Sequence, residues 1–427
     1  MGGSFTSYNG TACNRLVRLN PNGTVDTAFV TASGGAADAT VRALAMEADG
    51  GILVGGDFAN FGGTASEGLV RLLASGARNP VALNLPYTIG WNTSIRSILV
   101  QEDGKIMTAG SLYLGSTGTG FRSGVARLNT NGANDATFNP DAGAHLAGNT
   151  NSLRAVETII RQPDGKYIIG GQFTAYDENA APQIARVNAN GSFDPSFVPP
   201  GFANTVATLL LQPTGKVVVG GWFSSPVGYL ERLLPAGGSD GSFNQGTGPA
   251  GSVYALARDG SGGIWVGGNF FNYNGTACRP IVKISSGLNA YDAWADTVFA
   301  QSQFAAGSAA AGADADGDGR PNIIELLAGS NPNSAGATSL VAQTFATAGS
   351  NTHLQASLSR NSAGTGLWIM AQFGNDLTGW FPSPPATGTN AVYDIVEDNS
   401  SRFTVRDKTA SGSAPRRFVR FVVGVPQ

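Results

Sequence analysis

A repeat of about fifty residues is the feature that most limits how this chain can fold. A small-residue pair followed by one variable and one large apolar residue recurs six times, with spacings of 53, 54, 61, 50 and 47 residues. The copies read GGSF at 2, GGDF at 55, AGSL at 109, GGQF at 170, GGWF at 220 and GGNF at 267. Such a period indicates one structural unit that is repeated and covered by its neighbours.

Each unit contains short apolar runs that predict strands. Two runs precede the glycine pair and are joined by turn residues, as in "IRSILVQEDGKIMT", where Asp103-Gly104 predicts a tight type I′ hairpin turn. A variable loop and a third run such as "GVARLN" or "QIARVN" follow the pair. The glycine pairs themselves fit positions that require a positive φ or a close approach of neighbouring strands.

One basic residue recurs in every third run, and in most copies an acidic residue follows it eight positions later. A pair present in almost every unit serves a need of every unit, so we interpret it as a structural hydrogen bond between the strand and the next turn rather than as a binding site. The basic residues are Arg18, Arg71, Arg127, Arg186, Arg232 and Lys283, and their partners are Asp26, Asn79, Asp135, Asp194 and Asp240, with Tyr291 and Asp292 in the last copy.

Units of three or four antiparallel strands need neighbours on both faces, which predicts blades packed around a common axis. A parallel β-helix, the second fold considered, requires much shorter repeats. The patterns D-G-K-I-x-V-G-G-x-F and A-R-L-N-x-N-G-S-x-D resemble the delta-60 repeat of bacterial secreted and surface β-propellers. This resemblance covers residues 2 to about 288. It implies an all-β propeller over 1–288, with about five full four-stranded blades and one partial blade, and it carries no catalytic signature.

The hexapeptide YNGTAC occurs at Tyr8–Cys13 and again at Tyr273–Cys278, and it holds the only two cysteines of the chain. The two copies are the same loop of two different units. Equivalent positions of separate blades usually lie farther apart than the roughly 7 Å that a disulfide allows. We therefore expect two free thiols, with a disulfide as the less favoured alternative.

Composition removes several function classes. The net charge of −3 argues against a nucleic-acid or anionic-membrane partner. No apolar run is long enough for membrane insertion. Two histidines and two cysteines, far apart in sequence, predict neither a zinc site nor a catalytic triad. Because Met1 leads directly into the middle of a repeat with no signal peptide, we expect a part of a longer protein whose export signal lies upstream. We expect the chain to lie outside the cell or on its surface, as a monomer or as part of that longer chain.

The segment "DADGDGRPNIIE" follows the spacing D-x-D-x-D-G-x5-E of a calcium-binding loop. Calcium prefers six to eight hard oxygen ligands, and the invariant glycine of such loops, here Gly319, permits a sharp turn. A solvated acidic turn is the other interpretation. The predicted Ca²⁺ ligands are Asp314, Asp316, Asp318, the Arg320 carbonyl, Asn322 and Glu325.

The flanks of this loop predict two helices. "AYDAWADTVFAQ" is amphipathic, and "NIIELLAG" places Ile323, Ile324 and Leu327 on one apolar stripe. Helix, loop and helix together resemble a single unit of the dockerin or thrombospondin type 3 kind, which implies a calcium-stiffened linker over 289–336. From about residue 337, six short alternating runs predict a small β-sandwich over 337–427, similar to modules that end bacterial surface proteins.

Function is expected in the loop residues that the units do not share. The leading hypothesis is a non-catalytic extracellular binding or scaffold protein whose propeller loops bind a carbohydrate or a protein. The alternative is a propeller enzyme, a lyase or glycosidase that acts on polysaccharide through the carboxylates Asp177 and Glu178. A purely architectural spacer is the third possibility. The predicted ligand-binding residues are Trp91, His145, Tyr176, Asp177, Glu178 and Trp222.

Overall fold

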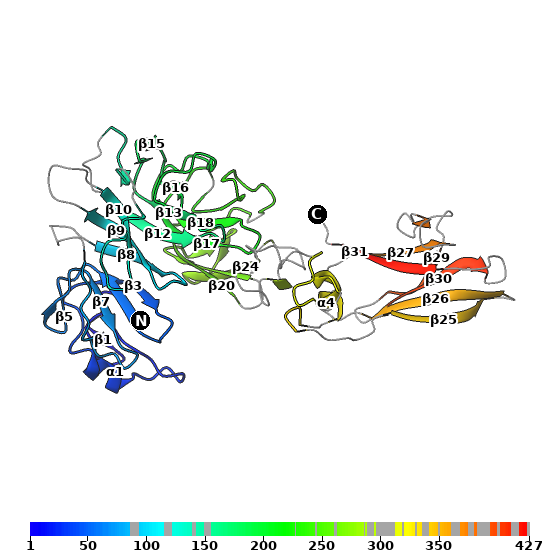
Figure 1. Ribbon diagram of the computed structural model, residues 1–427, viewed down its shortest axis with the longest axis horizontal. Coiled ribbons are helices and arrows are strands. Elements are labelled where there is room, and N and C mark those ends of the chain that lie inside the picture. The colour runs from blue at the N-terminus through cyan, green and yellow to red at the C-terminus, as the bar shows by residue number, and fades with distance from the viewer. Residues whose placement is uncertain are drawn as a thin grey trace. The chain divides into compact units, whose positions relative to one another are not determined.

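The computed structural model of this chain divides into two compact units. The first comprises Met1–Ala257 and Trp265–Lys283, and the second comprises Arg258–Ile264 and Ile284–Gln427. Figure 1 shows both units, which are described here separately. The described residues are 1–85, 94–114, 122–138, 142–148, 155–226, 228–243, 246–259, 263–285, 287, 294–295, 312–317, 320–328, 331–334, 341–348, 351–359, 368–374, 380–381, 393–398, 402–410 and 418–424.

Five three-stranded antiparallel sheets follow one another along the chain, each with its second strand in the middle. We number them blades 1 to 5 (Figure 1, blue through green). Blade 1 consists of β3 Val41–Met46, β4 Ile52–Gly56 and β7 Leu69–Leu72; blade 2 of β8 Ser94–Val100, β9 Ile106–Leu114 and β10 Arg122–Leu128; blade 3 of β12 Val156–Arg161, β13 Tyr167–Gly171 and β16 Ile184–Val187; blade 4 of β17 Val206–Leu211, β18 Val217–Gly221 and β19 Leu230–Leu233; and blade 5 of β20 Val253–Arg258, β21 Gly263–Gly268 and β24 Ile281–Ser285.

A partial blade precedes blade 1. Gly2 pairs with Leu16, and Leu19 pairs with Val25, so this copy has parts of its second and third strands. A short helix, α1 Thr27–Ala32, follows with Asp26 as its N-cap, whose side chain accepts the N–H of Phe29. Within the described residues, five full blades and one partial blade agree with the number predicted from the sequence.

The blades differ from the prediction in having three regular strands instead of four. A single antiparallel bridge stands in the place of the fourth strand, as between Val187 and Phe193 in blade 3. The pairing stops there because the next residue turns the chain: the N–H of Asp194 donates to the Arg186 carbonyl, and the Asp194 side chain then accepts the N–H of Ser196. The same bridge recurs as Leu72–Arg78, Leu128–Asn134 and Leu233–Ser239.

The Asp-Gly turns between first and second strands also differ from the prediction. Gly104 has a φ of 77°, but Asp103 is not in the left-handed region, so the turn is not type I′. Asp103 instead accepts the N–H of Lys105 with its side chain, at 3.1 Å. A type I turn closed by one left-handed glycine is the next commonest hairpin connection.

True type I′ turns occur in the variable loop after the glycine pair. Four units carry a two-residue hairpin there, with both central residues at positive φ. The turn pairs are Asn9-Gly10 between β1 Ser7–Tyr8 and β2 Thr11–Ala12, Gly62-Gly63 between β5 Asn60–Phe61 and β6 Thr64–Ala65, Asp177-Glu178 between β14 Ala175–Tyr176 and β15 Asn179–Ala180, and Asn274-Gly275 between β22 Asn272–Tyr273 and β23 Thr276–Ala277. The two YNGTAC segments are thus equivalent hairpins. Cys13 and Cys278 are free thiols, as predicted.

Successive blades pack face to face through the glycine pairs. β3 contacts β8, β8 contacts β12, and β12 contacts β17. The first glycine of a pair receives a β-branched side chain from the first strand of the next blade. A β-carbon on this glycine would lie 2.6 Å or less from that side chain, so the two blades could not approach this closely without a shift; the third copy has Ala109 at this position. The pairs are Gly2 with Val41, Gly55 with Ile95, Gly170 with Val206, and Gly220 with Val253.

The second glycine acts within its own blade. A β-carbon on Gly171 would lie 2.2 Å from the Ala155 carbonyl oxygen, because the first strand bulges at this point. The bulge appears as a register shift between Val156 and Thr158 in the pairing of β12 with β13. Equivalent shifts occur in blades 1, 2 and 4. The glycine pair is therefore required for close approach, and not for positive φ.

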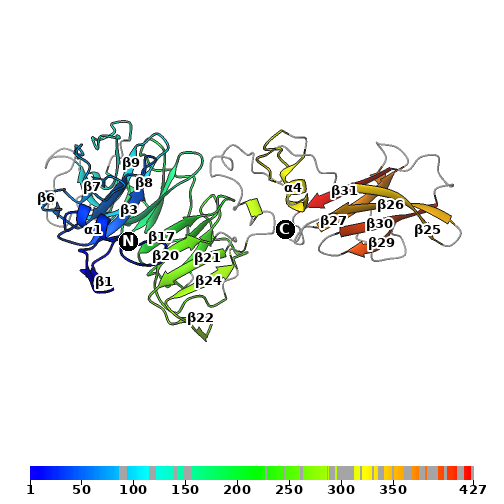
Figure 2. The same ribbon diagram turned by 90° about the horizontal axis from the view of Figure 1, so that it is seen from below.

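Blade 5 has an exposed following face (Figure 2, green sheet with β20, β21 and β24). Trp265 and Ile281 are 40% and 56% exposed, whereas their equivalents in blade 1, Leu53 and Leu69, are 0% and 2% exposed. The nearest atoms to a β-carbon on Gly267 lie 3.9 Å away and belong to its own sheet. Among the described residues, the other four glycine pairs each receive a side chain from the following blade, and this pair receives none.

The second unit contains α4 Asn322–Ala328 and two antiparallel sheets. Leu354, Ala356, Phe403 and Val405 of the first sheet share an apolar core with Ala371 of the second. The first sheet has the order β25 Val341–Ala348, β26 Asn351–Ser359, β30 Arg402–Ala410 and β29 Tyr393–Asp398, and the second has the order β28 Trp380–Phe381, β27 Trp368–Gly374 and β31 Phe418–Gly424. Among the described residues, no helix is long and apolar enough to cross a membrane.

Candidate ligand-binding face

The repeated arginine holds three parts of the fold together. In blade 3, Arg186 donates from Nε to Asp194 at 2.8 Å and from Nη2 to Ser196 at 2.8 Å. Its Nη1 reaches the Pro235 carbonyl of blade 4, also at 2.8 Å. The guanidinium lies 5.0 Å from the ring centre of Phe197. Arg127 makes the same set of contacts in blade 2, so the pair is structural, as predicted, and it also links neighbouring blades.

The aspartates of these pairs have pKa values below the ordinary aspartate value. Burial by itself would raise the pKa of Asp194, but hydrogen bonds from Lys166, Ser196 and Arg186 outweigh burial and hold its pKa well below the usual range. Asp135 and Asp240 have lowered pKa values for the same reasons. Blade 1 has Asn79 in this position, and there Arg71 pairs with both oxygens of Glu47, at 2.7 and 2.8 Å. The repeated charged side chains are therefore engaged in ion pairs within the fold.

Non-repeated side chains gather where each first strand bulges. In blade 3 the backbone N–H of Gln172, the residue after the glycine pair, donates to the Ala155 carbonyl, just before the bulge in the first strand. This hydrogen bond places the residue after the glycine pair beside the bulged residue. These two positions vary freely from blade to blade. We call the resulting surface the variable face, and define it by Arg42, Asp57, Arg96, Glu157, Gln172, Trp222 and Tyr254.

The first half of the variable face is charged and internally paired. Asp57 accepts from Arg42 and from Ser94 of the next blade, each at 2.6 Å. Arg96 of blade 2 binds both oxygens of Glu157 of blade 3, at 2.6 and 2.8 Å. Burial opposes ionisation of Asp57, but the hydrogen bonds from Arg42 and Ser94 lower its pKa overall. The charges within each ion pair neutralise one another, and the Ser94–Asp57 and Arg96–Glu157 contacts join adjacent blades.

The second half of the variable face is aromatic and uncharged. Trp222 of blade 4 lies against Tyr254 of blade 5, with ring centres 6.4 Å apart and an interplanar angle of 81°. Both side chains remain open to solvent, at 41% and 50% exposed. Exposed aromatic pairs of this kind are commonly binding surfaces, because they bury much area with little loss of side-chain entropy.

A cavity of about 410 Å³ lies beside Trp222 between blades 3 and 4. Its size falls within the usual 300 to 1,000 Å³ of small-molecule sites. Apart from Trp222, the described residues that line it contribute apolar side chains, amides and hydroxyls, and none of them is ionisable. The residues that line it include Gln172, Thr174, Gln183, Asn204, Thr205 and Trp222.

The predicted ligand-binding residues divide into three groups. Trp222 is placed on the variable face, as described. Tyr176 and His145 are fully buried, which corrects their assignment as ligand contacts: the Tyr176 hydroxyl donates to the Gly191 carbonyl at 2.8 Å, and His145 Nδ1 lies 3.0 Å from the Gly143 carbonyl. Trp91 lies outside the described residues.

Asp177 and Glu178 form the tip of a type I′ turn, where other copies have Asn-Gly or Gly-Gly. Asp177 accepts the N–H groups of Ala142 and Gly143, at 3.0 and 2.8 Å. Asn274 accepts the N–H of Gly248 in the same way in the last copy. Asp177 therefore has the structural role of a repeat position, and Glu178 is exposed beside it.

Sequence reasoning missed Tyr254, Gln172 and the charged residues of the variable face. A signal was present, because each occupies one of two columns of the repeat that vary while the adjacent columns are constant. Reading the repeat by its variable columns, in addition to its constant ones, would have found them.

Comparison with known proteins agrees with this architecture. A family model described as a domain of unknown function (DUF5122) beta-propeller matches residues 1–29, 47–80, 101–138, 162–197 and 212–243. A second model, described as a two component regulator propeller, matches residues 247–270. The chain is a β-propeller repeat protein. No curated protein sequence matches it.

Two solved structures are distantly similar to this propeller chain. PorZ of Porphyromonas gingivalis, described as an essential bacterial surface component of the type IX secretion system, is 14% identical, with a TM-score of 0.33, and the match covers 66% of this chain. A protein from Lactobacillus plantarum is 11% identical, with a TM-score of 0.30, over 58% of this chain and 85% of its own. The chain spans only 35% of the length of PorZ.

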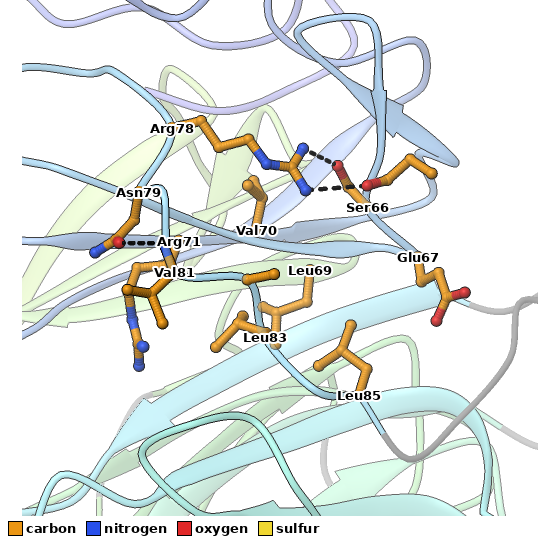
Figure 3. Close-up of a pocket in the computed structure, with 12 residues that line it drawn as sticks. Ser66, Glu67, Leu69, Val70, Arg71, Arg78, Asn79, Val81, Leu83 and Leu85 are labelled. Carbon is orange, nitrogen blue, oxygen red and sulfur yellow. Dashed lines mark hydrogen bonds between the residues drawn. The ribbon is translucent and has the colours of Figure 1, made fainter.

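A second cavity of the propeller, about 330 Å³, lies at the edge of blade 1 (Figure 3). Arg78 lines it and donates to Ser66 at 2.7 Å and to the Ala65 carbonyl at 3.0 Å, while Leu69, Leu83 and Leu85 form an apolar wall. Arg78 is thus engaged in holding the β5–β6 hairpin against the sheet.

The predicted calcium loop is partly described. Gly317 has a φ of 77° and donates its N–H to Asp314, and the N–H of Ala315 donates to the Asn322 side chain at 3.3 Å. Asn322 and Glu325, both on α4, are 0% and 1% exposed. Asp318 and Gly319 lie outside the described residues, as does most of the preceding predicted helix. Among described side chains no three acidic, histidine or cysteine groups come together as a metal site.

α4 confirms the predicted helix. Of its predicted apolar stripe, Ile323 is buried at 8% exposed and Ile324 is half-buried, and the side chain of Leu327 lies outside the described residues. Leu326 is also buried, at 0% exposed. The predicted ligands Asn322 and Glu325 lie three positions apart, on one face of the helix.

Proposed function

We propose that this chain is a non-catalytic binding protein of the cell exterior or surface, whose propeller presents its variable face to a carbohydrate or protein ligand. The observation that carries the proposal is that repeated and non-repeated residues lie in different environments. Repeated ionisable residues are held in contacts within and between blades, whereas non-repeated residues collect at the bulges and leave Trp222 and Tyr254 exposed.

The same observation weighs against the alternative of a polysaccharide lyase or glycosidase. General acid–base catalysis by two carboxylates requires both groups to be available at one substrate. Asp177 uses its side chain to accept two backbone N–H groups, and Glu157 is bound by Arg96. Glu178, the second carboxylate of the predicted catalytic pair Asp177 and Glu178, lies at the tip of a turn.

The test is a binding screen with the whole chain against glycans and against surface-protein extracts, followed by Trp222→Ala and Tyr254→Ala. We expect a retained ligand whose binding falls at least tenfold in both variants. Binding that is unchanged in both variants would contradict the placement of the site. Turnover of a polysaccharide that is lost in an Asp177→Asn, Glu178→Gln double variant would contradict the non-catalytic proposal.

We also propose that the segment from Asp314 to Glu325 binds one Ca²⁺ ion. The support is the spacing of its carboxylates, which follows the D-x-D-x-D-G-x5-E pattern of a calcium-binding loop. Such an ion would add positive charge among the carboxylates and fix the start of α4.

Calorimetric titration of the whole chain with calcium tests this second proposal. We expect a single binding event that disappears in Asp316→Ala and in Glu325→Gln. The absence of calcium-dependent heat in the unmodified chain would refute it.

A further inference from the structure

We infer that the cavity beside Trp222 binds an uncharged pyranose sugar, as part of a neutral glycan. This inference rests on the proposed binding function and specifies the ligand class of the same site. It follows from three features of the cavity: its walls, its charge and its shape.

The walls combine one exposed aromatic ring with planar amides and hydroxyls. Trp222 contributes the ring, and Gln172, Gln183 and Asn204 contribute amides that can both donate and accept. A pyranose ring has an apolar face of C–H groups and an equator of hydroxyls, each also a donor and an acceptor. An indole beside amides matches both parts of that chemistry, because the ring covers the C–H face and the amides engage adjacent hydroxyls.

Packing holds the indole in place before any ligand binds. The edge-to-face contact with Tyr254 restrains the Trp222 side chain, and Trp222 follows Gly221, whose close approach to the Thr205 carbonyl fixes the backbone. The backbone N–H of Trp222 donates to the same Thr205 carbonyl at 2.9 Å. A ring restrained in this way loses little entropy when a sugar stacks on it.

Electrostatics favours a neutral ligand over an acidic one. Among the described residues, no lysine or arginine lines the cavity. The Glu157 carboxylate accepts from the cavity residue Gln172 at 3.3 Å, and its own counter-charge, Arg96, is already bound to both of its oxygens. The described lining therefore offers an anionic sugar such as a uronate no available cation, which disfavours its binding.

Shape favours a sugar over a protein surface. Stable protein interfaces bury about 1,200 to 2,000 Å² in total around an apolar centre. Here the open surface is a concave space of about 410 Å³ whose walls come from the loops before β17, after β13 and after β18. A concave space of this size accepts a short stretch of a glycan, which can extend along the variable face past Tyr254.

The experiment measures binding of neutral and acidic oligosaccharides to the whole chain by calorimetry and on a glycan array. The neutral probes are oligomers of glucose, mannose, galactose and N-acetylglucosamine, and the acidic probes are oligouronates and sulfated fragments. We expect at least one neutral series to bind, with a loss of at least tenfold in Trp222→Ala and of several-fold in Asn204→Ala. The acidic probes are expected to bind at least tenfold more weakly.

Trp265→Ala is the matched control. Trp265 is also a solvent-exposed tryptophan, 40% exposed against 41% for Trp222, but it does not line the cavity. Its removal is expected to change sugar affinity less than twofold. Circular dichroism melting of each variant establishes that it is folded, and Trp222→Phe, which keeps an aromatic face, is expected to retain most of the affinity.

Each other outcome separates this inference from the proposed function. If a protein ligand binds and is lost in Trp222→Ala while no neutral sugar binds, the sugar inference is wrong and the binding function stands. If only acidic sugars bind, or if Trp265→Ala weakens a neutral sugar as much as Trp222→Ala, the sugar inference is also wrong. If no ligand of any class binds the whole chain, both fail.

Discussion

The packing of the glycine pair predicts that two glycine-to-alanine substitutions at equivalent positions, Gly220→Ala and Gly267→Ala, differ in their effect on stability. In Gly220→Ala the new β-carbon would lie 2.6 Å from Val253 and 2.9 Å from Thr208, so blade 5 must move away from blade 4. In Gly267→Ala the same atom, at the equivalent position of blade 5, has no neighbour closer than 3.9 Å. Neither glycine has a positive φ, so backbone strain does not separate the two.

The magnitudes follow from packing and from the unfolded chain. Overpacking a well-filled contact costs about 1 to 3 kcal/mol. Replacing a glycine by alanine without strain changes stability by between zero and a gain of about 1 kcal/mol, because the unfolded chain loses freedom. The effect on the unfolded chain is common to both variants and cancels, so we expect Gly220→Ala to be less stable than Gly267→Ala by about 1 to 3 kcal/mol.

The assay is urea unfolding together with native-state hydrogen exchange. Because the chain has two compact units, exchange of the β18 and β20 amides reports the blade 4 and blade 5 contact directly. Gly220→Ala should lower the protection of these amides, and Gly267→Ala should leave it unchanged. Equal stability of the two variants would refute the conclusion that the first glycine admits the next blade.

Three further predictions concern charge. Arg186→Ala should cost about 1 to 3 kcal/mol in urea unfolding because it removes charge-assisted hydrogen bonds to an Asp194 side chain that is 7% exposed, although Lys166 still lies 2.8 Å from that carboxylate, whereas Arg18→Ala, whose side chain is 42% exposed, should cost less; equal losses would contradict the structural role. The lowered pKa values of Asp135, Asp194 and Asp240 stabilise the fold above the ordinary aspartate pKa near 3.9, and this stability should be lost as the pH falls below about 4, less so in Asp194→Asn; an unfolding midpoint that is flat from pH 7 to pH 3 would be the contrary result. Glu231 is 5% exposed where other copies have Val70 or Ala185, and burial raises its pKa despite a hydrogen bond from Ser239, so Glu231→Val should stabilise the chain by about 1 to 3 kcal/mol at pH 7, and by less at pH 4, where a carboxyl of raised pKa is protonated in the native state.

The functional residues show how sequence and structure divide the information. The sequence singled out Trp222 because no other copy has a tryptophan after the glycine pair. It could not join Trp222 to Tyr254, which lies 32 residues away in the next unit, because the meeting of the two rings depends on how blades 4 and 5 pack against each other. His145 and Tyr176 were equally unusual in sequence, yet burial removes both from any ligand, and burial is a property of the assembled blades.

The sequence alone determined the blade count, the order of strands within a blade, the free thiols and the structural role of the repeated arginine, because all of these follow from local pattern and its period. The tertiary structure decided what period cannot express: that Arg18, Arg71, Arg127 and Arg186 also reach into the following blade, that one bridge replaces the fourth strand, and that unlike residues of neighbouring blades meet on one face. The physical reason is that periodicity constrains contacts within a unit, whereas contacts between units depend on how closely two backbones approach, which in four copies is set by the missing side chain of the first glycine of the pair.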